Sequence, residues 1–429
     1  GKGALLAVTT GGSNVAIGSG ASAALTTAAR TIFIGTGAGA AVTTTGGSNV
    51  SDGSVGIGYS ALEALTSGTG NIAIGIEALV SHTTGSRNIS IGYKSMDGTA
   101  GDANDAPAST DNIAIGYDAL GGNWADDEDS NFNVGIGNYV MDAAMNAATY
   151  NTAIGHNAMG ALTTGIRNTA LGASTLSNLT TGDHNVGLGM LCMDNLATGH
   201  RNIAIGYAAL DAADGGENDN IAIGTDAMGN ANADGVIRNI AIGNYAGDGM
   251  GTVGASIDNI FMGHGAGGGA WDTAVSSYNV GIGVYVLSGA MNGALRNTSI
   301  GYNSLSALTT GDDNVVVGAA AGSAITTGSN NLLIGVNAGL AMTDNTTNVI
   351  IGRDAMATAD SGEDGNVVIG YLAGDGINHN SADNNVIIGN SAGRGGAQAM
   401  QSCVVIGATA MDATAANAQT GTIAIGQDA

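Results

Sequence analysis

The sequence predicts an all-β protein with short helical turns, built as a parallel β-solenoid of about 23 coils with a period of 17–20 residues. Three observations predict this fold class. The pattern Asn-Ile-Ala-Ile-Gly at 202–206 recurs in similar form from 14–18 to 422–426, its final glycine occurs 23 times, and nine of the 22 intervals between these glycines are 17 residues long. A fixed short period is typical of stacked units rather than of a globular domain.

The segment that carries the pattern alternates like a short β-strand. With the final glycine as position 0, position −1 is apolar in all 23 copies, and position −3 is Ile, Val or Leu in 20 of them. Successive side chains of a strand point to opposite faces, so positions −3 and −1 share one face, and positions −4, −2 and 0 share the other. Positions −4 to 0 are therefore expected to form the strand of each coil.

The rest of each coil is expected to turn back to the next strand. The segment 59–65 has the apolar spacing of about one and a half helical turns. Thr-Thr-Gly, as at 163–165, 180–182 and 309–311, then closes the coil with a turn whose glycine is expected to adopt a positive φ. Each coil is thus predicted to be a strand, a helical or 3₁₀ turn, and a tight turn.

One column of the repeat is polar. Position −4 is asparagine in 19 of the 23 copies. Side chains stacked at the spacing of strands, about 4.8 Å, can form an amide ladder in which each asparagine hydrogen-bonds the next. The clearest members of this predicted ladder are Asn71, Asn88, Asn168, Asn185, Asn202, Asn314 and Asn331.

Side-chain volumes at positions −2 and +4 vary inversely. In 12 of the 14 complete copies with a small residue at −2, position +4 is Leu or Met, as in Ala204 with Leu210. In six of the eight copies with a large residue at −2, position +4 is Gly, as in Phe33 with Gly39. Because interiors are close-packed, two positions that exchange volume share one space. Position −2 is therefore predicted to point into the coil.

If position −2 points into the coil, positions −3 and −1 point outward and form an apolar stripe along the solenoid. A soluble monomer does not expose such a stripe to water. Burial of identical stripes around a common axis would give a homo-oligomer, and three chains is the preferred number. The alternative is that another segment of the same chain covers the stripe. The predicted interface residues are Ile17, Ile74, Ile115, Ile154, Ile203, Ile205, Ile223, Ile242, Ile334, Ile351 and Ile388.

No linker interrupts the repeat, so one solenoid over 1–429 is expected. Inserted loops are predicted near 36–53, 97–111, 121–132, 247–257 and 265–277.

The amino-acid composition argues against nucleic acid and membranes as binding partners. The chain has 35 acidic and 10 basic residues and a net charge of −25, which opposes binding to nucleic acid or to an anionic membrane surface. No run of 18 apolar residues is present, so membrane insertion is not expected. Cys192 and Cys403 give neither a disulfide framework nor metal-site spacing, and are expected to be inert packing residues.

The nine residues Thr-Gly-His-Arg-Asn-Ile-Ala-Ile-Gly at 198–206 resemble the head repeats of trimeric autotransporter adhesins and similar repeats of bacteriophage tail-fibre proteins. That adhesin family builds trimers of left-handed parallel β-rolls from shorter coils, so the resemblance implies a trimer. Because the sequence contains no recognisable coiled-coil stalk, the resemblance favours a fibre over a cell-anchored adhesin. It implies an extracellular or virion-surface location, with other virion proteins or a cell-surface glycan or receptor as partners.

Few residues suggest a catalytic, metal-binding or ligand-binding site. The six histidines occupy different columns, mostly at turn positions expected to face solvent, and no catalytic set emerges. Asp126, Asp127 and Asp129 could ligate calcium, although a solvated acidic loop is the simpler interpretation. Trp124 and Trp271 lie in insertions, where exposed rings could contact a glycan or, alternatively, anchor the loop.

The sequence therefore predicts a structural protein and no enzyme: a trimeric solenoid of a viral tail fibre or appendage that presents host-attachment surfaces. A self-assembling extracellular filament, a surface adhesin head and a glycan-processing β-solenoid enzyme are the alternatives.

Overall fold

The computed structural model describes residues 1–42, 51–99, 108–124, 129–231, 235–251, 254, 256–271, 274–394, 400–411 and 418–429. This part of the chain is all-β and contains no helix, and it forms a parallel β-solenoid, which confirms the predicted fold class. The chain divides into two compact units, 1–215 and 216–429, and each is described by itself. The single solenoid over 1–429 stays a prediction.

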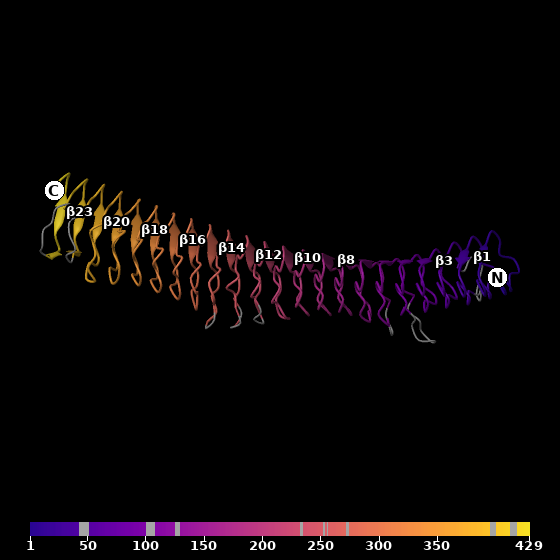
Figure 1. Ribbon diagram of the computed structural model, residues 1–429. Helices are drawn as coiled ribbons and strands as arrows, with labels where there is room; N and C mark the ends of the chain where they lie inside the picture. Colours follow the sequence, from indigo (N-terminus) through magenta and orange to yellow (C-terminus); the bar gives the residue numbers. More distant parts are fainter. Residues whose placement is uncertain are drawn as a thin grey trace. The chain divides into compact units, whose positions relative to one another are not determined.

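The first unit contains eleven three-residue strands. They are β1 (Val15–Ile17), β2 (Ile32–Ile34), β3 (Val55–Ile57), β4 (Ile72–Ile74), β5 (Ile89–Ile91), β6 (Ile113–Ile115), β7 (Val134–Ile136), β8 (Thr152–Ile154), β9 (Thr169–Leu171), β10 (Val186–Leu188) and β11 (Ile203–Ile205). Each strand pairs in parallel with the next (Figure 1). The register keeps equivalent positions of the repeat side by side, as in Gly187 beside Ala204.

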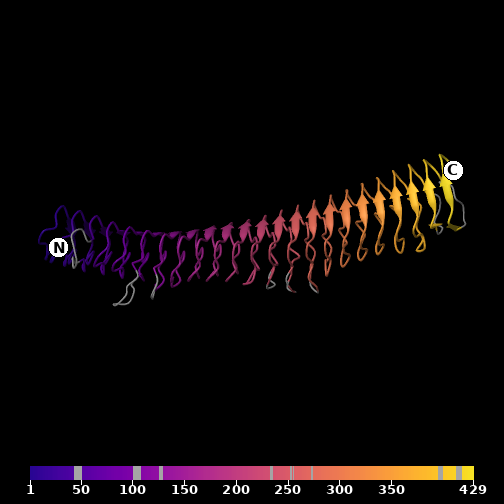
Figure 2. The same ribbon diagram turned by 180° about the vertical axis from the view of Figure 1, so that it is seen from behind.

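The second unit continues the same repeat. Its strands are β12 (Ile221–Ile223), β13 (Ile240–Ile242), β14 (Ile260–Met262), β15 (Val280–Ile282), β16 (Thr298–Ile300), β17 (Val315–Val317), β18 (Leu332–Ile334), β19 (Val349–Ile351), β20 (Val367–Ile369), β21 (Val386–Ile388), β22 (Met400–Gln401), β23 (Val404–Ile406), β24 (Gln419–Thr420) and β25 (Ile423–Ile425). The three-residue strands pair in parallel in this order, and β22 pairs separately with β24. Within each unit the strands lie along one side of the coils and the turns along the other (Figure 2).

The predicted helical turn is wrong. After the strand, residues with left-handed φ alternate along the chain, for example Ser60 at 53° and Leu62 at 55°. The N–H of Ser60 donates to Thr36 O at 3.0 Å, and the N–H of Leu62 donates to Ala78 O at 3.1 Å, on the coils before and after. A helix would direct these groups to carbonyls four residues earlier in the chain. These bonds between coils alternate with bonds to carbonyls three residues earlier in the same coil, such as Glu63 N–H to Ser60 O at 3.2 Å. The apolar spacing of 59–65 therefore reflects inward side chains of successive turns rather than a helix.

The predicted positive φ of the Thr-Thr-Gly glycines is also wrong. Gly165, Gly182 and Gly311 do not adopt left-handed φ values. A Cβ on Gly165 would stand 2.5 Å from Gly182 O and 3.1 Å from Asn168 Nδ2, so these glycines are required by close approach between coils. The glycine at position 0 meets both requirements: Gly189 has a φ of 137°, and its Cβ would stand 2.3 Å from Gly206 O.

The core lies inside each coil, where positions −2 and +4 meet as the volume exchange predicts. Ala204 and Leu210 are both fully buried. A Cβ on Gly39 would stand 2.6 Å from Phe33 Cδ1, so glycine at +4 makes room for the ring at −2. Of the predicted loops, 43–50, 100–107, 125–128, 252–253, 255 and 272–273 lie outside the described residues.

Candidate oligomer interface

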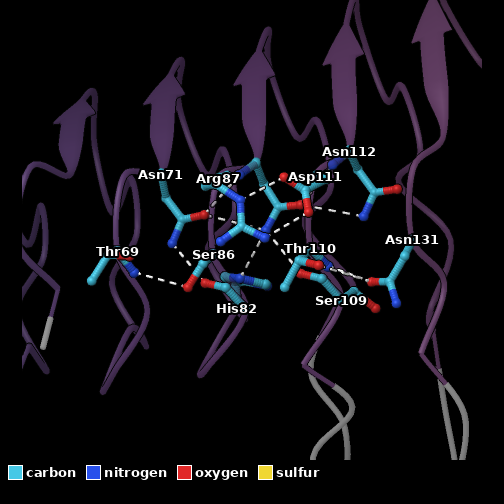
Figure 3. Close-up of polar contacts among 12 residues, drawn as sticks. Thr69, Asn71, His82, Ser86, Arg87, Ser109, Thr110, Asp111, Asn112 and Asn131 are labelled. Atoms are coloured by element: carbon cyan, nitrogen blue, oxygen red, sulfur yellow. Dashed lines mark hydrogen bonds and ion pairs between the residues drawn. The ribbon is translucent and has the colours of Figure 1, made fainter.

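The asparagines at position −4 hydrogen-bond one another through the stack (Figure 3). Oδ1 of Asn71 accepts both the backbone N–H of Asn88 at 3.0 Å and its Nδ2 at 3.2 Å. Nδ2 of Asn88 also donates to Ser109 O at 2.9 Å, on the turn of the following coil. Each amide thus holds the strand of one coil to the strand and the turn of another.

The same arrangement recurs along both units. In the first unit, Asn185 donates twice to Asn168, and Asn202 donates twice to Asn185. In the second, Asn331 donates twice to Asn314. All seven predicted ladder asparagines are buried, so their hydrogen bonds form away from water, where an unsatisfied amide would be costly.

The column at position −5 is exposed and carries charge pairs. Arg87 donates to Asp111 through Nε and Nη2, each at 2.6 Å, and this guanidinium lowers the pKa of Asp111 (Figure 3). Arg238 with Asp258 and Arg296 with Asp313 repeat the two-pronged geometry. The remaining pairs of this column include stacked rings, such as Phe132 and Tyr150 with centroids 4.9 Å apart.

The isoleucines predicted to face outward do so. On β8, Ile154 is 36% exposed while Ala153 beside it is fully buried. Ile17, Ile74, Ile203 and Ile334 are also exposed, and Ile115, Ile205, Ile223, Ile242, Ile351 and Ile388 are partly exposed. All eleven side chains therefore retain solvent exposure in the single chain.

Sequence reasoning missed a third column of this surface. All six tyrosines at position +1, namely Tyr59, Tyr93, Tyr117, Tyr207, Tyr302 and Tyr371, are exposed. Tyr93 and Tyr117 stack, with centroids 5.4 Å apart and planes inclined by 10°. Position +1 continues the two-residue period of −3 and −1, and that period was the available signal. We call positions −3, −1 and +1 together the outer face.

The outer face of the first unit is large. From −3 to +1 it is about 13 Å wide at about 3.3 Å per residue, and eleven strands about 4.8 Å apart extend over about 50 Å. The resulting area of about 650 Å² includes polar side chains at position +1, such as Asn138 and His156. The −3 and −1 columns alone cover about 330 Å², within the range of about 300–600 Å² for the largest apolar patch of a typical soluble monomer. An apolar band bordered by the charged −5 column has the organisation of a protein–protein interface.

The tryptophans do not offer exposed rings. Trp124 is 2% exposed and Trp271 is 1% exposed, so the hypothesis of glycan contact through these rings is wrong, and their burial fits the alternative that they anchor the loops. The ring of Trp271 packs edge-on against Phe261, with centroids 5.6 Å apart. Phe261 occupies position −2 of its coil, so Trp271 turns inward to enlarge the core.

The calcium hypothesis cannot be placed on the structure as a site. Asp126 and Asp127 lie outside the described residues, and Asp129 is exposed. Among the residues that the structure describes, no three His, Cys, Asp or Glu side chains gather as metal ligands would.

The histidines and cysteines lie apart from one another. His184 and His200, on neighbouring coils, do not form a catalytic pair; His200 Nδ1 instead accepts the backbone N–H of Asp183 at 3.0 Å. His82 differs from the expected solvent-facing histidine, because it is fully buried and its burial lowers its pKa to about 4. Cys192 and Cys403 are buried free thiols.

Comparison of the chain with protein-family models, with curated proteins and with solved structures finds no match. Within the described ranges, no helix is long and apolar enough to span a membrane.

Proposed function

We propose that this chain is a structural protein that assembles by its outer face into a homotrimeric β-solenoid fibre. The observation that carries the proposal is the continuity of this face, whose −3 and −1 columns keep the same register from strand to strand. At about 25 cal/mol per Å² of apolar surface removed from water, a seam of this size would contribute many kcal/mol to assembly.

Three chains would place the three faces around one axis, with the charged −5 columns at the rim. A closed cyclic arrangement buries the outer face of every chain to the same extent and leaves none of these faces exposed to water. The assembled fibre would serve as part of a viral tail fibre or appendage, at the virion surface or outside the cell. The resemblance of the 198–206 repeat to adhesin heads and tail fibres supports this setting.

The proposal is tested by charge substitution on the outer face. Ile154→Asp puts a carboxylate into the apolar column, whereas Thr164→Asp adds the same charge to an exposed turn of the neighbouring segment. Sedimentation velocity should give dissociated chains for Ile154→Asp and intact oligomers for Thr164→Asp and the unmodified protein. Intact oligomers of Ile154→Asp would overturn the assignment of the outer face. Open-ended growth of the unmodified protein would instead indicate a polymerising filament.

A further inference from the structure

The second unit contains a cavity of about 400 Å³ between two exposed tyrosines. Tyr245 and Tyr285 occupy position +2 of the coils of β13 and β15, and the coil of β14 lies between them. That middle coil has Gly265 at position +2 and Gly268 at position +5, so it places no side chain between the tyrosines at these two positions. A Cβ on Gly265 would stand 2.8 Å from Tyr285 Cδ1, so the glycine also allows this ring to lie over the neighbouring coil.

A third aromatic ring completes the cavity wall. His264 stands at position +1 of the middle coil and meets both tyrosines edge to face, 5.8 Å from Tyr245 at 83° and 5.2 Å from Tyr285 at 77°. His264 is exposed, and the two tyrosines are each 43% exposed, so all three rings are accessible from solvent. These edge-to-face contacts hold His264 against both tyrosines at one side of the cavity.

The polar part of the lining is acidic. Asp248 supplies its one carboxylate, and Oδ1 of Asp248 accepts a hydrogen bond from Asn230 Nδ2 at 2.9 Å. Burial and the nearby charge of Asp226 raise the pKa of Asp248. Ser288 adds a hydroxyl, which donates to Tyr285 O at 3.0 Å. No lysine or arginine lines the cavity.

We propose that this cavity binds an organic ammonium group, either a quaternary ammonium or an alkylamine. The faces of aromatic rings attract cations, and an aromatic box with a carboxylate is the arrangement that recognises quaternary ammonium ligands. His264 stands between the two tyrosines, at 5.8 and 5.2 Å from their centroids, so a cation would enter the cavity over Gly265 and Gly268 rather than midway between the tyrosine rings. The attraction between a cation and a ring acts over about 6 Å from the ring centroid.

The acidic lining favours a cation over a neutral or an anionic ligand. An anion would meet Asp248 with no basic group to offset the repulsion. A neutral sugar could stack on the tyrosines, but it would leave the half-buried carboxylate uncompensated. An ammonium group would make cation–π contacts with the rings and would neutralise the carboxylate of Asp248.

The inference goes beyond the proposed function. His264 at position +1 belongs to the outer face and would lie at the edge of the trimer interface, whereas the other lining residues, at positions +2 and +5, lie off that face. The binding test itself needs only the intact protein. Isothermal titration with tetramethylammonium, choline and n-butylammonium should show saturable binding, whereas methyl glucoside and acetate should show none. Vesicles of phosphatidylcholine should bind if the ammonium is carried by a lipid headgroup, and binding of the free ammonium probes alone would assign a different carrier of the same group.

Three variants locate the binding. Asp248→Asn keeps an acceptor for Asn230 and removes the charge, and Tyr245→Leu removes a ring face while retaining an apolar side chain. Both should weaken tetramethylammonium binding at least tenfold. Tyr139→Leu removes a tyrosine at position +2 of another coil that is 39% exposed and lies outside both the cavity and the outer face, and it should bind as the unmodified protein does.

The inference would be overturned if the unmodified protein bound no ammonium probe, if methyl glucoside bound as tightly as tetramethylammonium, or if Asp248→Asn had no effect. Sedimentation of the same samples separates this failure from failure of the proposed function. Trimers without ammonium binding would reject only the cavity assignment, and monomers that bind ammonium would reject only the fibre.

Discussion

Asn88 donates both its backbone N–H and its side-chain amide to the single Oδ1 of Asn71, at 3.0 and 3.2 Å. One side-chain oxygen therefore satisfies two buried donors of the following coil. Because the arrangement repeats from Asn168 to Asn185, replacing one asparagine affects two coils at once.

Asn168→Ala should destabilise the first unit by at least about 3 kcal/mol. The substitution leaves two donors of Asn185 without their acceptor and Gly182 O without its donor, and each unsatisfied buried group costs about 1–3 kcal/mol. Urea denaturation followed by circular dichroism measures the loss.

Asn168→Thr is the matched control. Thr31 occupies the same column, and its N–H and hydroxyl both donate to Asn14 Oδ1, so the column accommodates threonine. This variant should lose clearly less stability than Asn168→Ala. Equal losses for the two would show that the ladder bonds contribute little.

The exchange of volume between Phe33 and Gly39 predicts a strong coupling. Gly39→Leu should be destabilising because its Cβ alone would stand 2.6 Å from the ring of Phe33. The left-handed backbone conformation at position +4 does not itself exclude leucine, since Leu79 has a φ of 51° at this position of another coil. Phe33→Ala should cost about 3–5 kcal/mol through the cavity it leaves.

The double variant Phe33→Ala/Gly39→Leu tests this coupling, because leucine then fills the space vacated by the ring. It should be more stable than the sum of the two single losses by at least about 2 kcal/mol. Strict additivity in a double-mutant cycle would show that the two positions do not share one space.

His82 predicts a pH dependence of stability. Its Nε2 lies 3.3 Å from the amide nitrogen Nδ2 of Asn88, and its Nδ1 lies 3.1 Å from Thr99 Oγ1, an arrangement that suits the neutral ring. Burial lowers its pKa from 6.5 to about 4, so between these values the unfolded chain binds the proton and the folded chain does not. The stabilisation is complete above pH 6.5 and is lost as the pH falls towards 4, by about 3 kcal/mol in total.

Urea midpoints at pH 4.5 and 7.5 check this prediction. His82→Gln should show a smaller drop on acidification than the unmodified protein, whereas His184→Gln, at an exposed position, should show the same drop. Identical drops in all three proteins would contradict a buried neutral His82.

The thiol of Cys192 should be unreactive in the native state. It is fully buried, its Sγ donates to Ala204 O at 3.2 Å, and burial raises its pKa to about 12. Since the thiolate is the reactive form, an aromatic disulfide reagent at pH 8 should label no cysteine until the chain is denatured, and two afterwards. Rapid labelling of the folded protein would contradict this.

Much of the fold could be predicted because the repeat displays its own physical constraints. Asparagine at −4 has a role only if coils stack in register, and the exchange between Phe33 and Gly39 shows which side of the strand is inside. The turns could not be predicted in the same way. Leu62 has helical spacing, but its N–H bonds to Ala78 O on an adjacent coil, whereas the N–H of Glu63 bonds to Ser60 O within the same coil. A single sequence does not distinguish this alternation from a helix.

The residues that line the cavity were also harder to predict than the outer face. Trp124 and Trp271 stand in insertions, where a ring can either be exposed or anchor the loop, and both rings are buried. Tyr245 and Tyr285 lie inside the regular repeat, and the cavity between them depends on missing side chains at Gly265 and Gly268. Such a feature emerges only when three coils are stacked.

The most direct test of the account is the mass of the native assembly at micromolar concentration, by native mass spectrometry or sedimentation equilibrium. Burial of the outer face by sister chains predicts a particle of three times the 41.6 kDa chain mass. A stable particle with the mass of one chain would contradict the central claim, because the outer face would then be exposed to water in the native protein.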